Sequence, residues 1–219
     1  MLLAITEKGD VSTSTWLRLD NGVAGAHLID LALAERVRLE DDVLVVADGR
    51  PTGDGPLDAT LSGIAGDEPR SPKDWIARLA KAEPHEAVVA SLREQGVLRE
   101  ERSKVLGIFN RSRDLEADPG PEREVRGRLH AALVEGGALD ARTASLASLV
   151  SATELVGEVF PDKEERKAAK RRLDELKEGD ELRDALGAAN QAAVEAMLVA
   201  VTFMVSVSVA TSAAVIANN

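Results

Sequence analysis

The chain has 219 residues, of which 44% are hydrophobic and 30% charged, and this composition is typical of a globular protein and excludes a disordered or fibrous one. Its formal net charge of −11 repels nucleic-acid phosphates, and no basic patch stands out in the sequence, so we expect no nucleic-acid partner. Cysteine is absent and the 3 histidines, His27, His85 and His130, lie far apart, so we expect no disulfide, no metal site and a cytoplasmic location.

The N-terminal part of the chain predicts a buried helix followed by a hairpin. The first residues, MLLAITEKGD, carry no basic region before a long apolar run, so we expect no signal peptide. The stretch GVAGAHLIDLALAERVRLE, residues 22–40, opens with two glycines and then predicts a well-buried helix from Ala24 to Glu35. Two short β-prone runs on either side of the acidic residues 40–42 predict a strand–turn–strand hairpin.

A second helix–hairpin unit is predicted over residues 85–112, with the same order of elements as the first unit at 24–48. Between the two units, a loop rich in Gly, Pro and Asp leads into a short helix with Ser71 as its N-cap and Pro72 at its first position. The second unit begins with a helix that ends before Gly96. A strand VLRE, a polar turn and a strand KVLGIF follow.

The KVLGIF strand is a candidate interaction surface, because four of its residues are too apolar to be exposed to water. These residues are Val105, Leu106, Ile108 and Phe109. They either pack onto their own domain or contact a second copy of the chain, another protein or a membrane.

The C-terminal half, residues 121–216, is predicted to be helical, with helices near 121–135, 139–159, 162–177 and from 180 to about 210. In the third of these helices the apolar residues Ala169, Leu173 and Leu176 form one narrow stripe. Its basic residues could meet an anionic partner, but interleaved acidic residues favour a solvated face with ion pairs inside the helix.

The last two dozen residues, from AMLVAVTFMVSVSV onward, carry no charge, and this length can span a bilayer. Frequent Ala, Ser and Thr and the absence of basic flanks favour a buried helix that packs through small side chains. A membrane span and an apolar tail packed on another subunit are the alternatives.

These elements predict a mainly α protein, a single globular helical domain over residues 1–219 with short surface β-hairpins. The sequence contains no phosphate-binding glycine loop, no dinucleotide-binding glycine motif, no nucleophile elbow and no HExxH zinc motif. We therefore expect a non-catalytic protein without a cofactor. A helix followed by a hairpin is also typical of winged-helix proteins, but HEAVVASLREQG has one Arg against two Glu and is a poor recognition helix.

Several segments in order resemble the Golgi phosphoprotein 3 (GPP34) family: GVAGAHLIDLALAERVRLE, PTGDGPLDATL, DWIARL, LREQGVLREE and LASLVSATELVGEVF. The resemblance reaches to about Met204, and PTGD..LD is among its most specific parts. It implies a mostly helical domain with surface hairpins, as the residues themselves predict. The family includes phosphoinositide-binding Golgi adaptors of eukaryotes and many bacterial proteins, and the composition favours a bacterial member.

The resemblance also implies where a lipid head group would bind. In the eukaryotic adaptors a tryptophan and three arginines hold the inositol phosphate, and the tryptophan corresponds to Trp16. The first arginine falls on Ala24, and the other two fall near Ala82 and His85, so the strong phosphate ligands are largely missing. Arg18, Lys81 and Arg36 could supply compensating charge at this site.

Two functions follow from these observations. The first is a peripheral membrane or adaptor-type module that binds an anionic phospholipid head group through Trp16, Arg18, Lys81 and His85, with binding altered or lost. The alternative is an oligomeric protein-interaction scaffold without lipid binding. Both are consistent with a cytoplasmic protein, and the first adds peripheral membrane association.

Overall fold

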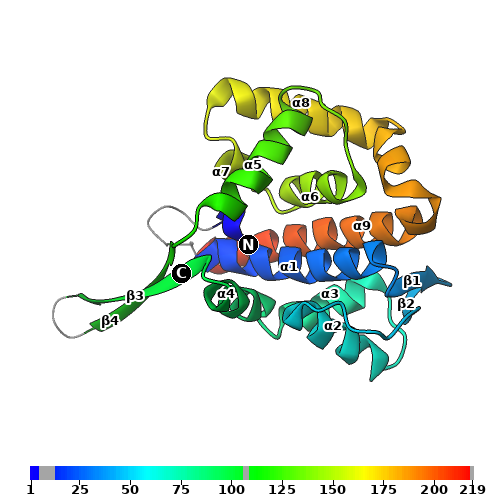
Figure 1. Cartoon of the computed structure of the whole chain (residues 1–219), viewed down its shortest axis with the longest axis horizontal. Coiled ribbons are helices and arrows are strands. Elements are labelled where there is room, and N and C mark those ends of the chain that lie inside the picture. The colour runs from blue at the N-terminus through cyan, green and yellow to red at the C-terminus, as the bar shows by residue number, and fades with distance from the viewer. Residues whose placement is uncertain (5–12, 106–108, 218–219) are drawn as a thin grey trace.

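The computed structural model describes residues 1–4, 13–105 and 109–217. Two long helices, α1 (Thr13–Leu33) and α9 (Glu181–Ala217), run side by side through the middle of the protein (Figure 1). The other elements of the described residues are η1 (Leu2–Ala4), β1 (Val37–Glu40), β2 (Val43–Val46), α2 (Gly55–Ala65), α3 (Pro72–Ala80), α4 (Pro84–Glu94), β3 (Leu98–Val105), β4 (Phe109–Glu116), α5 (Gly120–Leu133), α6 (Ala141–Ala152), α7 (Val156–Val159) and α8 (Lys163–Glu178). The predicted mainly α fold with short hairpins is confirmed.

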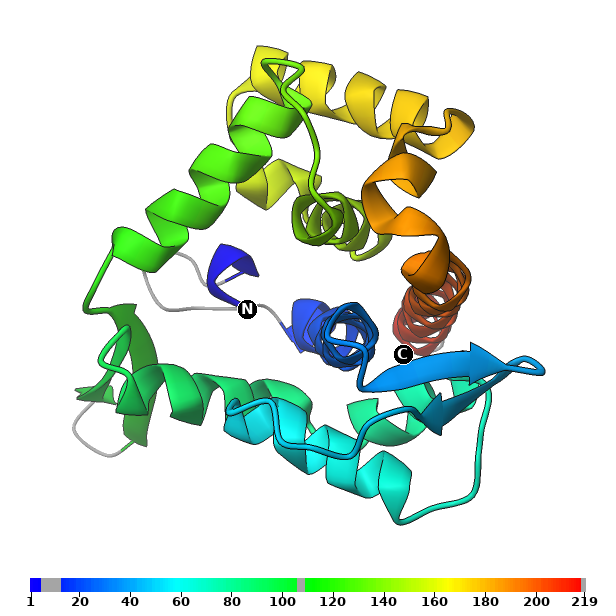
Figure 2. The ribbon, with the colours of Figure 1, turned by 45° about the vertical axis from the view of Figure 1, so that its right-hand side comes forward.

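The other helices form two groups on opposite sides of the central pair. Helices α2, α3 and α4 lie on one side and α5, α6, α7 and α8 on the other, as Figure 2 shows with α1 seen almost end-on. Each group has its own cluster of buried apolar side chains, and both clusters reach α1, through Leu28 in the first and Leu19 in the second. The predicted stripe of Ala169, Leu173 and Leu176 on α8 is buried in the second cluster.

The two glycines of the GVAG stretch lie inside α1, which begins earlier than the sequence predicts. The predicted helix start at Ala24 is therefore wrong, because α1 begins at Thr13. A Cβ atom on Gly25 would lie 2.2 Å from Cγ2 of Val201, and one on Gly22 would lie 2.6 Å from Cγ2 of Thr153. These glycines allow neighbouring elements to approach α1 closely. Because Val201 belongs to α9, the contact at Gly25 joins α1 to α9.

The β1–β2 hairpin forms as predicted, with Val37 opposite Val46 and a turn at Asp41 and Asp42, both of which have positive φ. Asp tolerates this left-handed conformation better than most residues. Ser71 caps α3 as predicted, since its Oγ accepts a hydrogen bond from the Asp74 amide at 3.2 Å.

The β3–β4 hairpin differs from the prediction. Its ladder runs from Leu98 opposite Glu116 to Val105 opposite Phe109, so the predicted polar turn lies inside β3. Figure 1 shows these strands projecting away from the helical body. The sequence predicted a strand at VLRE, but the charged residues that follow it in LREERSKV show no apolar alternation, and the continuation of the strand was therefore read as a turn.

The helices of the C-terminal half follow the prediction with two interruptions. The helix expected over 139–159 is broken at residues 153–155, where Glu154 has a φ of 59°. Helix α9 is kinked at Gly187, whose φ of 70° suits glycine.

Because the central pair depends on close approach, Gly25→Ala is expected to destabilise the protein. The added methyl group meets a wholly buried valine, and overpacking of this kind costs about 1–3 kcal/mol. Urea unfolding measures the change. Gly63→Ala on α2 is the control, since nothing lies within 4 Å of its added Cβ, and it should stabilise the protein by about 0.5–1 kcal/mol. Equal effects of the two substitutions would contradict the packing argument.

Candidate functional site

The residues of the expected head-group site lie at the starts of α1 and α4 and at the end of α3. Trp16 and Arg18 belong to the first turns of α1, His85 to the first turn of α4, and Lys81 follows the last residue of α3. The side chain of Trp16 lies outside the described part of the structure. The geometry of the site therefore has to be argued from the other three residues.

His85 is bound to a carboxylate. Its Nδ1 lies 2.6 Å from Oδ1 of Asp20, and only 6% of Asp20 is exposed. A sequence-based search could not find Asp20 as the partner, because the two residues are 65 positions apart. His85 lies near the position of one of the family's phosphate-binding arginines, and it has a buried carboxylate beside its imidazole.

Arg18 faces a different part of the protein. Its Nη1 donates to Oε2 of Glu154 at 2.7 Å, in the turn between α6 and α7. Residues two apart on a helix do not share a face, so Arg18 points away from the side of α1 on which Asp20 meets His85. Lys81 is exposed. The structure brings His85 together with Asp20 but does not bring Arg18 to the same place.

Ala24, to which the resemblance assigns the family's first arginine, is fully buried in the core beside α9. An arginine cannot be accommodated there without disrupting the packing of the central pair. The position therefore contributes to the fold and offers no surface to a ligand.

The apolar candidates on the second hairpin lie at its tip. Val105 and Phe109 form the last pair of the described ladder. Leu106 and Ile108 lie outside the described residues, as do the side chains of Val105 and Phe109. The proposal that this tip contacts a partner or a membrane stays a prediction.

The PTGDGPLD segment has a structural role. The Asp58 carboxylate accepts hydrogen bonds from the Thr52 amide at 2.6 Å, from the Thr52 hydroxyl at 2.7 Å and from the Gly53 amide at 3.2 Å. Asp54 caps α2 by accepting from the Leu57 amide at 3.0 Å. Hydrogen bonds from Thr52 hold the pKa of the Asp58 carboxyl below its ordinary value.

The uncharged C-terminal run was expected to form a buried helix, but the structure exposes one apolar face of α9. Val199, Phe203 and Val207, spaced one helical turn apart, are 70%, 48% and 44% exposed. The opposite face, which includes Met197 and Val201, is fully buried. Because both faces are apolar in sequence, the uncharged run alone could not show which side would be covered.

This exposed face borders a groove of about 800 Å³ between α6, α8 and α9. The ammonium of Lys73 on α3 lies 4.5 Å from the ring centre of Phe203. The segment Asn190–Ser208 is also long and apolar enough to cross a membrane by length and composition, although a third of it is buried in the protein.

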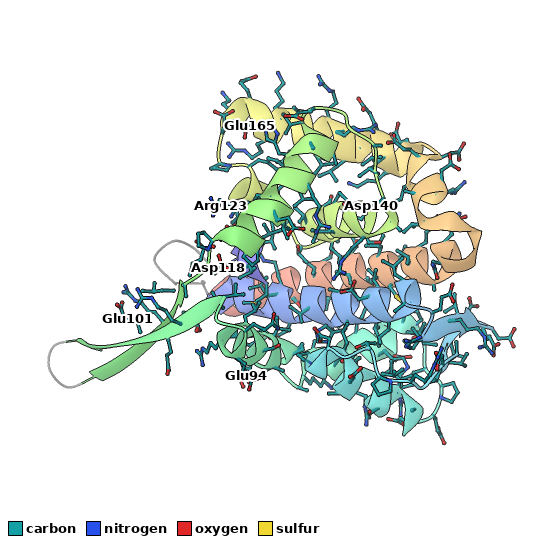
Figure 3. The ribbon with its side chains drawn as sticks, viewed as in Figure 1. Glu94, Glu101, Asp118, Arg123, Asp140 and Glu165 are labelled. Atoms are coloured by element: carbon teal, nitrogen blue, oxygen red, sulfur yellow. The ribbon has the colours of Figure 1, made fainter. Side chains whose placement is uncertain are left out.

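Charged side chains are distributed over the outer helices. Figure 3 shows, for example, Glu94 on α4, Arg123 on α5 and Glu165 on α8. The basic run on α8 is interleaved with acidic partners, as in the pair between Arg171 and Glu175 at 3.8 Å. Among the described residues no group of three His, Asp or Glu side chains is placed to hold a metal ion.

The fold and these contacts define a class: a mainly helical protein built around a buried helix pair, with two hairpins and an apolar face on its last helix. The family model of Golgi phosphoprotein 3 (GPP34) matches residues 1–197, and the chain belongs to this family. No curated protein matches the chain. The family match ends inside α9, just before the exposed residues Val199, Phe203 and Val207.

The role of Asp58 predicts a pH-dependent loss of stability in Asp58→Asn. The folded carboxyl has a lowered pKa, so its contribution is complete above the unfolded pKa of about 4 and is lost as the pH falls through the folded value. Urea unfolding should find the variant less stable than the wild type at pH 7, with the difference shrinking below about pH 4. A difference that is independent of pH would contradict this role.

Proposed function

We propose that the protein is a non-catalytic, adaptor-type peripheral module of the GPP34 family in which recognition of phosphate head groups is weakened or lost. One observation carries the proposal: His85 and Arg18 each contact a carboxylate, that of Asp20 at 2.6 Å and that of Glu154 at 2.7 Å. We propose further that residues 1–219 form one helical domain and that the protein is cytoplasmic.

Because Asp20 is buried, a phosphate cannot easily replace it as the partner of His85. A phosphate that approached His85 would meet the Asp20 carboxylate, and like charges at this distance repel each other strongly in a partly buried site. If the phosphate took His85 for itself, Asp20 would keep its charge in the interior without that partner, which is costly. Glu154 is more exposed, so Arg18 is the cation that a phosphate could recruit more easily.

The net charge of −11 supports the same conclusion, because it opposes approach to anionic membranes. Membrane association, where it occurs, would then depend on apolar contacts or on a protein partner. The exposed face of α9 is one surface for such contacts, and the hairpin residues Val105 and Phe109 remain the second surface predicted from the sequence.

Co-sedimentation with liposomes at low salt tests this function. Vesicles containing phosphatidylinositol 4-phosphate, phosphatidylinositol or cardiolipin should bind the wild type no better than neutral vesicles. The double variant Asp20→Asn, Glu154→Gln removes the two negative charges that His85 and Arg18 contact, and it should bind the phosphoinositide vesicles at least about tenfold better.

Asp42→Asn with Glu178→Gln is the matched control, because it removes two negative charges from exposed positions. This control should bind as weakly as the wild type. Tight binding of the wild type to phosphatidylinositol 4-phosphate, or equal gains in the two double variants, would contradict the proposed loss of the site.

The exposed face of α9 supports a second candidate function, an oligomeric interaction scaffold. Val199 and Phe203 are large, exposed apolar side chains that line the groove, and such a surface is typical of interaction sites. We propose that Val199 and Phe203 contribute to contacts between copies of the chain. This function requires no lipid.

Light scattering at high protein concentration should then find a dimer or larger assembly of the wild type. Val199→Ser with Phe203→Ser should shift the protein towards a monomer without loss of helix content. Thr202→Ala, at an exposed neighbouring position, is the control and should leave the assembly unchanged. A monomeric wild type would exclude this candidate.

A further inference from the structure

The exposed face of α9 has a negative charge on one side of Val199 and a positive charge on the other. Val199 lies four residues after Glu195 and four before Phe203, so these three residues share one face of the helix. The ammonium of Lys73, on α3, lies 4.5 Å from the ring centre of Phe203. A carboxylate therefore lies one turn before Val199, and an ammonium lies beside the residue one turn after it.

Both charged groups can accept a further partner. The ammonium of Lys73 has three N–H donors, and among the described residues no carboxylate pairs with it. The carboxylate of Glu195 is contacted by the Gln191 amide at 3.2 Å and by Nε of Arg183 at 3.5 Å. Both contacts use Oε1, so Oε2 can accept from a second cation. The side chain of Glu195 is 40% exposed, which leaves it within reach of another molecule.

The exposed hydroxyl groups on this face donate within the helix. The Thr202 hydroxyl donates to the Leu198 carbonyl at 2.9 Å, and the Ser206 hydroxyl donates to the Thr202 carbonyl at 2.8 Å. An apolar surface can therefore cover this part of α9 without leaving a hydroxyl donor unpaired, which would be costly.

A second copy of α9, packed antiparallel, supplies the charges that this face lacks. With a two-fold axis at Val199, residues at equal distances before and after Val199 lie opposite each other. Glu195 of one copy then faces Phe203 and Lys73 of the other, and the symmetry repeats this contact. The face thus carries the complement of its own charges, which favours a second copy over a lipid surface as its partner.

We infer that two copies of the chain associate through an antiparallel pair of α9 helices, with the two-fold axis at Val199 and an ion pair between Glu195 of each copy and Lys73 of the other. The inference rests on the second candidate function and gives its contacts one geometry. Val199 and Phe203 form the apolar centre, and the two helix axes approach to the usual distance of about 8–10 Å.

Disulfide cross-linking tests the position of the axis. The chain contains no cysteine, so a single introduced cysteine reports a single contact. Val199→Cys places the two thiols of the dimer next to each other on the axis. Mild oxidation should therefore produce a disulfide-linked dimer, which electrophoresis without reductant detects.

Ala192→Cys and Ser206→Cys are the matched controls, because both positions are exposed and lie seven residues on either side of Val199. In a dimer of either variant the two thiols are about 21 Å apart along the helix pair, and a disulfide needs Cα atoms about 4.4–6.8 Å apart. Each variant alone should therefore stay unlinked. A mixture of the two should cross-link, because residue 192 of one copy faces residue 206 of the other.

Charge reversal tests the ion pair. Glu195→Lys and Lys73→Glu each replace two attractive contacts in the dimer with repulsive ones, and each should raise the dissociation constant at least about tenfold. The double variant restores opposite charges and should return to within about threefold of the wild type. Asp42→Lys, at an exposed turn, is the control and should dimerise as the wild type does. Sedimentation equilibrium measures the constants, and circular dichroism checks that each variant is folded.

Two results would overturn this geometry and leave the scaffold function intact. In the first, the wild type is a dimer but Val199→Cys cross-links no faster than Ala192→Cys or Ser206→Cys alone. In the second, the double charge variant dimerises no better than the single variants. A monomeric wild type would exclude both the geometry and the scaffold function. If that monomer bound neutral vesicles and Val199→Ser abolished the binding, the face would belong to a lipid surface.

Discussion

The close contact between α1 and α9 is the constraint on which the rest of the structure depends. Gly25 leaves room for Val201 at a distance that any side chain would block, and Ala24 is buried in the same core. Because one side of α1 packs on α9, the other elements contact its remaining surface. Asp20 meets α4 on that surface, and Asp30 pairs with Arg142 of α6 at 3.6 Å.

The same contact determines the surroundings of one position of the head-group site that the family resemblance implies. The position of the first family arginine belongs to the helix pair and lies in the core. His85 contacts the buried carboxylate of Asp20, and the side chain of Arg18 extends from another side of α1 to Glu154. Negative charge therefore accompanies both groups, in a protein whose net charge is already −11. Contacts through apolar surfaces are then the more plausible physical basis for an adaptor-type function.

Local sequence signals predicted the parts of the fold that local interactions determine. Apolar periodicity predicted most helices and the stripe of α8, the pair Ser71–Pro72 predicted the start of α3, and the acidic turn predicted the first hairpin. The second hairpin was misplaced because its polar strands carry no burial pattern. The glycines of α1 were misread because their role depends on residues more than 100 positions away.

The candidate site was less predictable, because its electrostatics arise between distant residues. Arg18 and Glu154 are 136 positions apart, and no sequence spacing links them. Titration of the labelled protein with inositol 1,4-bisphosphate, followed by nuclear magnetic resonance at low salt, tests the central claim that phosphate recognition is lost. If recognition is lost, the signals of His85 and Arg18 show no saturable change. Saturable shifts at both residues would contradict it.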